Sequence, residues 1–306
     1  MKKVAIIVLD WNGAEVTGDC LHSLMEMEEY ANLQSQVVVV DNGSQPPTAS
    51  MLQAEFPSVL FLRSESNLGF AAGNNIGIRY ALENRFDYTL LLNNDTTVEK
   101  SFLSHLVYAM EATDNVAAAQ PKILFHHQKN LIWNAGTRFH SWLGLTRIRG
   151  YKETDKGQYD LQQYMPWLTG CCMLLNNKVL KYHNSKWLNE GYETYFEDVE
   201  LSLRLSNSGY RLLYVPASKI WHIAGYSVER QPSNEGKKSA HIVYTHTRNG
   251  FWILRKFLHP VWRPIALFRQ SMYTVCLMAF YTLRGRWKKL DAAFRALGDG
   301  LLEPLP

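Results

Sequence analysis

The sequence predicts an α/β protein with a doubly wound, mainly parallel central sheet and a C-terminal helical tail. Short apolar runs alternate with helical periodicity over residues 4–110, which is typical of parallel strands joined by helices. Each run ends in a turn rich in Asp, Asn or Gly. Near residue 236 the composition changes, and long helical periods then carry basic and aromatic residues. We therefore expect a sheet domain over residues 1–235 and a helical tail over residues 236–306.

Four strands are expected in the first half of the chain. Their apolar runs are continuous rather than alternating, which indicates strands buried on both faces. The expected strands cover residues 4–9, 37–40, 59–62 and 88–92. Helical periodicity covers residues 15–29, 48–55 and 102–110, and a glycine-bearing loop at residues 67–75 leads into a helix that reaches residue 83.

Polar side chains stand at the carboxyl ends of all four expected strands. They are Asp10 with Asn12, Asp41, Asn67 and Asp95. Turn formation explains each of these loops singly, and a helix cap is the alternative role for Asp95. Carboxylates at three of the four ends favour a ligand site, because open parallel sheets bind ligands at this edge. Their oxygens suit Mg²⁺ or Mn²⁺ carrying a diphosphate.

The absence of several known motifs argues against some classes of nucleotide-binding and metal-binding protein. No G-x-G-x-x-G follows the first strand and no G-x-x-x-x-G-K-[ST] occurs, so a dinucleotide-binding Rossmann domain and a P-loop are not indicated. The four cysteines show no C-x-x-C spacing, which argues against a zinc site or a disulfide framework and for a reducing, cytosolic setting. The apolar run at residues 4–9 is short and ends at Asp10, as expected of a first strand rather than an export signal.

Two further strands are expected in the second half of the chain. A buried apolar run at residues 166–175 includes Thr169 and Gly170 near its start. A last strand is expected at residues 211–215, and His222 follows it. A histidine after a strand is either a metal ligand or a side chain bonded to the backbone, and the residues alone leave both readings open.

A helix is expected over residues 195–204, with Glu197 and Asp198 in its first turn. The helix dipole favours anions at this position, so a capping role explains both carboxylates without any chemistry. The alternative is that one of them acts as a general base. A neighbouring like charge would raise the pKa of such a base.

The tail differs in charge from the rest of the chain. Residues 236–290 contain eleven Lys or Arg and no Asp or Glu, which leaves 21 basic and 28 acidic residues elsewhere, a net charge of −7. The tail is therefore expected to meet an anionic partner. No recognised nucleic-acid-binding motif accompanies the charge, so nucleic acid is not the expected partner.

An uncharged run at residues 271–283 lies between basic residues, with Trp262 and Trp287 near its ends. A helix that lies at a membrane surface fits this pattern better than a membrane span. Plain helical packing and a homodimer contact are the alternatives. A peripheral position on the inner face of the cytoplasmic membrane follows from the first reading.

Taken together, the motifs resemble those of the family 2 inverting glycosyltransferases, in particular the rhamnosyltransferase-like enzymes of cell-surface polysaccharide synthesis. The resemblance covers residues 4–225, and its motifs occur in order. They are Val39-Val-Asp-Asn-Gly-Ser44, Asn67-Leu-Gly-Phe-Ala-Ala-Gly-Asn-Asn75, Leu92-Asn-Asn-Asp95, Phe196-Glu-Asp198 and Trp221-His222. The resemblance implies a GT-A fold, a nucleoside-diphosphate sugar as donor and a divalent cation, Mn²⁺ or Mg²⁺.

The resemblance also implies roles for individual residues. Asp198 is the implied general base, and Asp95 with His222 is the implied metal site, because Asn93 replaces the first carboxylate of a D-x-D motif. Asp41 would contact a pyrimidine base. Other implied nucleotide-binding residues are Asp10, Asn12, Asn67, Gly69, Asn74 and Asn94. Thr169, Gly170 and Glu197 are expected on the acceptor side.

The donor sugar and the acceptor are less defined. The resemblance suggests L-rhamnose on a dTDP carrier, with UDP-linked sugars as the alternative, and a glycan or polyprenyl-diphosphate-linked acceptor. Two rival functions are a sugar-nucleotide pyrophosphorylase and a non-catalytic nucleotide-sugar-binding protein. The first would need a glycine-rich, basic loop after the first strand, which the sequence lacks.

Overall fold

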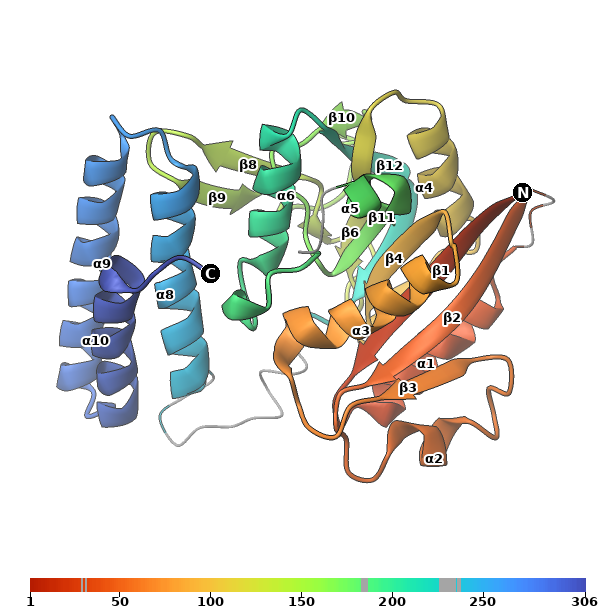
Figure 1. The fold of residues 1–306 in the computed structure, drawn as a ribbon, viewed down its shortest axis with the longest axis horizontal. Helices are drawn as coiled ribbons and strands as arrows, with labels where there is room; N and C mark the ends of the chain where they lie inside the picture. The colour runs from red at the N-terminus through yellow and green to blue at the C-terminus, as the bar shows by residue number, and fades with distance from the viewer. Residues whose placement is uncertain (29, 31, 183–186, 226–234, 236–237) are drawn as a thin grey trace.

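The computed structural model describes residues 1–28, 30, 32–182, 187–225, 235 and 238–306 (Figure 1). Within them a ten-stranded mixed sheet has the main order β10-β12-β6-β11-β4-β1-β2-β3, and β5 and β7 pair with β12 and β6. A separate hairpin joins β8 to β9. The strands are β1 (Lys2–Asp10), β2 (Leu33–Asp41), β3 (Leu60–Arg63), β4 (Tyr88–Asn93), β5 (Thr96–Val98), β6 (Val116–Phe125), β7 (Ile132–Asn134), β8 (Thr137–His140), β9 (Leu145–Ile148), β10 (Gln163–Tyr164), β11 (Cys172–Asn176) and β12 (Arg211–His222).

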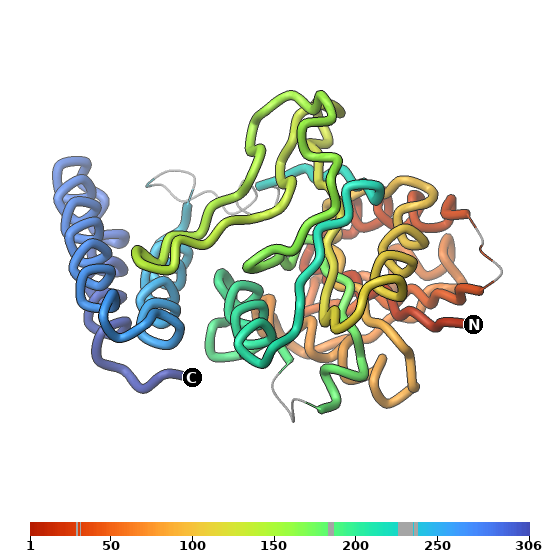
Figure 2. Tube along the Cα trace, turned by 90° about the horizontal axis from the view of Figure 1, so that it is seen from above, coloured from red at the N-terminus to blue at the C-terminus, as the bar shows by residue number. Residues whose placement is uncertain are grey.

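Helices cover both faces of this sheet, and three more form a group at one end of the molecule (Figures 1 and 2). The helices are α1 (Ala14–Met25), α2 (Thr48–Leu52), α3 (Gly69–Glu83), α4 (Phe102–Glu111), α5 (Asn177–Tyr182), α6 (Glu197–Asn207), α8 (Ala240–Phe257), α9 (Arg263–Leu283) and α10 (Trp287–Leu302). A short 3₁₀ turn, η1, covers Glu190–Tyr192.

Alternation along the parallel strands produces two cores. In β1, Val4, Ile6 and Val8 pack on the face covered by α1, α2 and α4. Ala5 and Ile7 pack on the opposite face with α3, α5 and α6. Because successive side chains of a strand point to opposite faces, a continuous apolar run is what a sheet covered on both sides requires.

Helix α3 lies close to β1 because glycines face the strand. A Cβ at Gly73 would lie 2.6 Å from Leu9 Cδ1, and a Cβ at Gly77 would overlap Ile7. The loop expected at residues 67–75 is therefore mostly helix, starting at Gly69. The expectation was wrong because glycines that suit a loop also allow a helix to pack closely on a sheet.

Strand β6 was not anticipated from the sequence. All ten of its residues are buried, yet it contains three alanines, Pro121 and Lys122, which are weak strand formers. The Lys122 ammonium is fully buried and pairs with Asp155 at 2.9 Å, so the charge is compensated locally. Tertiary packing, rather than propensity, makes this segment a strand.

The expected strand at residues 166–175 is shorter in the structure, starting at Cys172. Side chains take the preceding backbone N–H groups: Leu168 donates to Ser202 Oγ and Gly170 to Asp198 Oδ2, at 3.0 and 2.9 Å. These groups are therefore not available to a strand ladder. At the other end, β12 extends to His222, which makes this histidine the last residue of a strand.

The C-terminal helices pack against one another and against the sheet domain. Phe251 and Trp252 of α8 are buried, and Gly300 of α10 lies against Phe251. In the residues that the structure describes, no helix combines the length and hydropathy that crossing a bilayer requires.

Candidate active site

A cleft of about 820 Å³ lies at the carboxyl edge of the parallel strands, which we call the carboxyl-edge cleft. Six segments far apart in the sequence form its wall. They follow β1, follow β2, precede and begin α3, follow β4, precede α6 and begin α8. The lining residues are Leu9, Trp11, Asn12, Gly13, Asn42, Asn67, Leu68, Gly69, Phe70, Asn93, Asn94, Asp95, Glu193, Thr194, Tyr195, His241 and Ile242.

Register explains why the strand ends meet. In the parallel ladders Asp10 lies opposite Asp41, and Leu9 lies opposite Asn93. The three strands therefore end at the same level, and the loops that follow them open on one edge.

Two expected nucleotide-binding carboxylates lie behind this wall. Asp10 is fully buried and accepts hydrogen bonds from Thr17 Oγ1 at 2.8 Å and Asn94 Nδ2 at 2.9 Å. It therefore holds the turn after β1 against the turn after β4. Asn94 lines the cleft, but its amide nitrogen is taken by Asp10 and by Thr17.

Asp41 is likewise buried and forms a salt bridge with Arg63. Burial raises the pKa of this carboxyl, and hydrogen bonds from Ser44 and Thr48, together with Arg63, outweigh that effect and lower it. The carboxylate is thus ionised and engaged by protein groups. Its contact with a pyrimidine base stays a prediction.

Of the remaining expected nucleotide-binding residues, some line the cleft and one is buried behind it. Asn12, Asn67 and Gly69 line the carboxyl-edge cleft. Asn74 is buried within α3 and donates to the Phe70 carbonyl at 2.9 Å, so it supports the helix. Gly69 has a φ of +83°, and its backbone N–H donates to Asn67 Oδ1 at 2.9 Å. Asn67 therefore fixes the start of α3 beside the cleft.

Asp95 and His222 meet although 126 residues separate them in the sequence. The antiparallel pairing of β5 with β12 places His222 opposite Thr96, the residue after Asp95. Asp95 Oδ1 and His222 Nε2 are 3.1 Å apart, and both side chains are about 7% exposed. The structure thus brings the two expected metal ligands together at the edge of the cleft.

Electrostatics at this pair favour a cation. Burial lowers the pKa of His222, but Cys171 and Asp95 outweigh it and raise that pKa to about 10. The imidazole Nδ1 has no hydrogen-bond partner among the described residues, and the ring of Trp133 lies edge-on 4.6 Å away. The Asp95 carboxylate oxygen and the His222 Nε2 atom face each other, and a divalent ion suits the same two donor atoms.

The protein supplies only part of a coordination sphere. In the described part of the chain no group of three or more His, Cys, Asp or Glu side chains converges on one point. One carboxylate and one imidazole form an open site, whose other positions suit diphosphate oxygens and water. The residues present therefore fit a metal that is held jointly with a phosphorylated ligand.

Asp198 lies in the first turn of α6. Its Oδ2 accepts a hydrogen bond from Gly170 N at 2.9 Å and its Oδ1 accepts one from Val199 N at 2.7 Å. Burial raises the pKa of this carboxyl, and the backbone N–H groups partly offset the increase. The direction agrees with the expectation, but the main cause is burial rather than the charge of Glu197.

Glu197 is more deeply buried than Asp198, and its Oε2 atom has no hydrogen-bond partner within the described residues. Burial and then repulsion from Asp198 raise its pKa well above the ordinary value. The N-cap residue of α6 is Phe196, and no side chain caps the helix. Simple capping therefore does not explain this pair of carboxylates.

Gly170 lies between Asp198 and the wall of the cleft. A Cβ at this position would lie 3.2 Å from the Phe70 ring and 3.5 Å from Asp198 Cβ. The glycine thus allows Phe70 and Asp198 to approach each other. Thr169 is buried beside it and accepts a bond from Cys171 N at 3.3 Å, so it supports this turn rather than offering open surface.

Several lining residues were missed by sequence reasoning. Phe70 belongs to a motif that was recognised, and Tyr195 was expected only as the first residue of a helix, so neither was given a role in the site. His241 and Ile242 belong to the tail, and their place in the cleft follows from the packing of α8. Nothing local in the sequence indicates that the tail reaches this edge.

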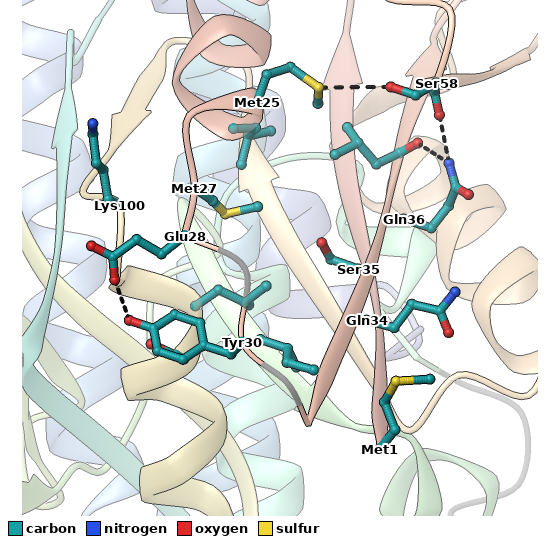
Figure 3. A pocket seen from close by; sticks show the side chains of 15 residues that line it. Met1, Met25, Met27, Glu28, Tyr30, Gln34, Ser35, Gln36, Ser58 and Lys100 are labelled. Atoms are coloured by element: carbon teal, nitrogen blue, oxygen red, sulfur yellow. Dashed lines mark hydrogen bonds between the residues drawn. The ribbon is translucent and has the colours of Figure 1, made fainter.

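A second cleft, of about 750 Å³, lies at the opposite ends of β1 and β2 (Figure 3). Some of its polar groups are paired with one another: Tyr30 donates to Glu28 at 2.7 Å, and Gln36 donates to the Ser58 carbonyl at 3.0 Å. Met1, Met25 and Met27 form much of the remaining lining. Because no convergent carboxylates face this cleft, the candidate active site is the carboxyl-edge cleft.

Comparison with known proteins agrees with the geometry. The family model described as "Glycosyl transferase family 2" matches residues 5–183. A low-salt glycan biosynthesis hexosyltransferase, Agl10, of Haloferax volcanii is 27% identical over 238 residues, 73% of this chain and 70% of the relative. An N-acetylglucosaminyl-diphospho-decaprenol L-rhamnosyltransferase of Mycobacterium tuberculosis is 24% identical over 71% of this chain and 76% of its own length. The rhamnosyltransferase WbbL of Escherichia coli is 28% identical over a region that covers 51% of this chain and 61% of the length of WbbL.

Solved structures show the same fold. The mannosyltransferase PcManGT of Pyrobaculum calidifontis, solved with GDP-mannose and Mn²⁺, has a TM-score of 0.56 at 13% identity and covers 98% of this chain and 87% of its own. GalNAc-T7, solved with UDP, GalNAc and Mn²⁺, has a TM-score of 0.56 at 16% identity, covering 72% of this chain and 43% of its own. The predicted GT-A architecture with C-terminal helices is confirmed. Proteins named rhamnosyltransferases are among the relatives that the chain resembles. The chain belongs to glycosyl transferase family 2.

Proposed function

We propose that this glycosyltransferase is a metal-dependent, inverting enzyme that moves a sugar from a nucleoside diphosphate to a hydroxyl group of a lipid-linked or polysaccharide acceptor. The observation that carries the proposal is that Asp95, which pairs with His222, and Asn67 at the start of α3 line the same cleft. Asp198 is not part of that lining; it accepts a hydrogen bond from Gly170, which lies against the lining residue Phe70.

The donor half of the reaction uses the carboxyl-edge cleft. Its volume of about 820 Å³ suits a nucleotide sugar, and the N-terminus of α3 turns the positive end of its dipole toward the cleft, where a diphosphate would lie. Asp95 and His222 would hold Mn²⁺ or Mg²⁺ together with that diphosphate. The metal, when bound, neutralises charge that develops on the leaving phosphate. The proposed donor is a dTDP-linked sugar, L-rhamnose, and UDP is the alternative carrier.

Asp198 acts as general base in this proposal. The acceptor hydroxyl transfers its proton to the carboxylate while its oxygen forms a bond to the anomeric carbon of the donor. The bond from that carbon to the phosphate oxygen breaks, and the nucleoside diphosphate leaves with the electron pair. One displacement inverts the anomeric configuration. The N–H groups of Gly170 and Val199 orient the carboxylate for this transfer.

Glu197 supports the base without sharing its task. Its pKa is raised well above the ordinary value, chiefly by burial and then by repulsion from Asp198, so it binds a proton more readily than an exposed glutamate does. In the proposal Glu197 carries that proton, and the negative charge stays on Asp198, where the proton of the acceptor is taken up. We place Glu197 with Thr169 and Gly170 around the base on the acceptor side.

The acceptor is proposed to be polyprenyl-diphosphate-linked and reached at the inner face of the cytoplasmic membrane. Helix α9 turns an apolar stripe to solvent, which we call the α9 outer face. Its residues are Ile265, Phe268, Met272, Val275 and Leu283. Basic residues, among them Arg284 and Arg286, adjoin its end, and this pairing of apolar and basic side chains suits an anionic bilayer surface. A homodimer through the same face is the alternative.

A panel of nucleotide sugars tests the function. We expect dTDP- or UDP-linked sugars to raise the melting temperature only when Mn²⁺ or Mg²⁺ is present, because a bound ligand stabilises the folded state. Chelation with EDTA should abolish both this stabilisation and turnover, and added metal should restore them. His222→Ala should lose the metal effect. Stabilisation that is equal with and without metal would contradict the assigned site, and binding without turnover would favour a non-catalytic binding protein.

A further inference from the structure

The loop that precedes the proposed base adopts an unfavourable backbone conformation. Glu193, Tyr195 and Phe196 have φ values of +59°, +68° and +71°, in the left-handed region that side chains with a Cβ rarely adopt. Three such residues among four positions make this conformation energetically costly for the backbone. Such a loop persists only where its surroundings hold it in place. We call this segment, residues 193–196, the 193–196 loop.

The 193–196 loop joins the two halves of the proposed site. Its residues Glu193, Thr194 and Tyr195 line the carboxyl-edge cleft, and the next two residues are Glu197 and Asp198. The Glu193 carbonyl accepts a hydrogen bond from Ala71 N at 3.0 Å, which ties the loop to the first turn of α3. A shift of this loop would move both the cleft wall and the base.

A side chain of α8 holds the loop from behind. Asn249 is fully buried, and its Nδ2 atom lies 2.8 Å from the Tyr192 carbonyl, 3.1 Å from the Thr194 carbonyl and 2.8 Å from the Tyr195 carbonyl. One amide nitrogen thus contacts three carbonyl oxygens of the same turn. Such contacts can stabilise a conformation that the backbone alone would leave.

Arg248 fixes the orientation of that amide. Its Nε–H donates to Asn249 Oδ1 at 3.1 Å, so the amide nitrogen is the atom that faces the carbonyls. Its Nη2 donates to the Gly191 carbonyl at 3.0 Å, and the guanidinium lies 4.1 Å from the Trp252 ring centre. Arg248 is itself buried, so the pair forms a rigid support.

We infer that Asn249, oriented by Arg248, is a positioning residue that holds the 193–196 loop in its strained form and so sets the placement of the cleft wall and of Asp198. The helical tail is then part of the catalytic apparatus. This inference rests on the proposed function for its effect on turnover, but the effect on the loop is independent of it.

Asn249→Ala tests the inference, with Asn177→Ala as matched control. Asn177 is also fully enclosed and its amide donates to a backbone carbonyl, that of Phe86 at 2.9 Å, far from the 193–196 loop. Hydrogen–deuterium exchange of the full-length protein is measured over residues 69–75 and 190–200. We expect faster exchange in both segments of Asn249→Ala and no change there in the control.

Kinetics give the second readout. We expect Asn249→Ala to lower kcat by about 10- to 100-fold and to weaken binding of UDP or dTDP in Mn²⁺, because small displacements of reacting groups are costly. The acid limb of kcat/KM should move to lower pH, since a loosened loop admits water around Asp198. The control Asn177→Ala should keep the wild-type kcat, nucleotide affinity and acid limb of kcat/KM, even if its melting temperature falls as much as that of Asn249→Ala.

Arg248→Lys is the second variant, in case Asn249→Ala fails to fold. It keeps the charge but lacks the Nε–H bond to Asn249, so it should show the same changes to a smaller degree. Exchange over residues 190–200 that equals that of the control in both variants would overturn the inference. Faster exchange in a protein whose Asp198→Asn variant retains turnover would support the loop assignment and contradict the assigned base.

Discussion

The parallel strands and helix α9 use similar apolar residues in opposite ways. In β4 the first five residues are buried, and in β2 the last five are. Helix α9 has 21 residues, of which only Ala266, Thr274 and Tyr281 are buried. Its bulky side chains point outward, with Phe268 68% and Leu283 86% exposed.

The difference shows that an apolar residue stabilises the fold only where the chain covers it. The strands are covered by helices on both faces, so their side chains form the two cores. The buried positions of α9 have small or polar side chains except for Tyr281, and its apolar stripe faces away from the protein. Contiguous exposed apolar patches usually mark an interaction surface. The four predictions below test this division, from the largest expected effect to the smallest.

The first prediction separates catalysis from the tail. Asp198→Asn removes the proposed base and should lower kcat by about 10²- to 10⁴-fold, the range typical of general base catalysis. Nucleotide-sugar binding, measured by calorimetry, and association with vesicles should both persist. Asp291→Asn, an exposed carboxylate on α10, is the matched control and should leave kcat unchanged. Normal turnover by Asp198→Asn would refute the assignment.

The second prediction compares leucines in the two regions. Leu90 in β4 is fully buried, so Leu90→Ala should reduce the free energy of unfolding by about 2–5 kcal/mol. Leu283→Ala on the α9 outer face should change it by no more than about 0.5 kcal/mol. Denaturant titration of both variants measures the difference. Equal losses would show that another part of the chain covers α9 in solution.

The third prediction concerns the surface that the α9 outer face meets. Phe268→Glu should weaken association with phosphatidylglycerol-containing vesicles at least about tenfold, because burial of a phenylalanine contributes about 1.5–3 kcal/mol. Tyr108→Glu, on α4 and 77% exposed, is the control and should bind as the wild type does. Cosedimentation measures both. Wild-type binding by Phe268→Glu, with a change of oligomeric state, would favour the homodimer.

The fourth prediction uses pH within the catalytic region. Burial and repulsion from Asp198 raise the pKa of Glu197, so the folded state holds a proton that the unfolded state releases. Stability therefore falls as pH rises from the ordinary Glu pKa towards the raised one. Glu197→Gln cannot lose a proton, so it should gain stability relative to the wild type over that window. Melting curves from pH 4 to 8, with exposed Glu65→Gln as control, measure the trend.

Much of the fold could be predicted from the apolar runs of the sequence, because these runs are the segments that pack in the two cores. The strands β1 and β2 were predicted from their continuous apolar runs, and the structure adds the parallel register that joins them. Strand β6 could not be predicted, because its alanines and Lys122 become strand-like only when neighbours and two aspartates surround them. The start of α3 was likewise hidden, because its glycines are explained only by the proximity of β1.

The site was predictable where a motif carries the chemistry itself. Asp95, His222 and Asp198 were identified by resemblance, and the structure places the first two within hydrogen-bond distance. Asp10, Asp41 and Asn74 were expected to bind the nucleotide, but they do not line the carboxyl-edge cleft: the two aspartates hold turns, and Asn74 supports helix α3. A sequence shows that a polar group stands at a strand end, but the direction of its side chain depends on partners such as Arg63 that come later in the chain.

The contact of Gly73 and Gly77 with β1 has a consequence for how donor preference can change. These two positions set how closely the helix packs on the sheet, and hence how far its first turn projects over the carboxyl-edge cleft. A methyl group added at either position would move α3 away from the sheet and change the shape of the cleft at the N-terminus of the helix. Selection or engineering can therefore change the shape of the carboxyl-edge cleft through residues that do not line it.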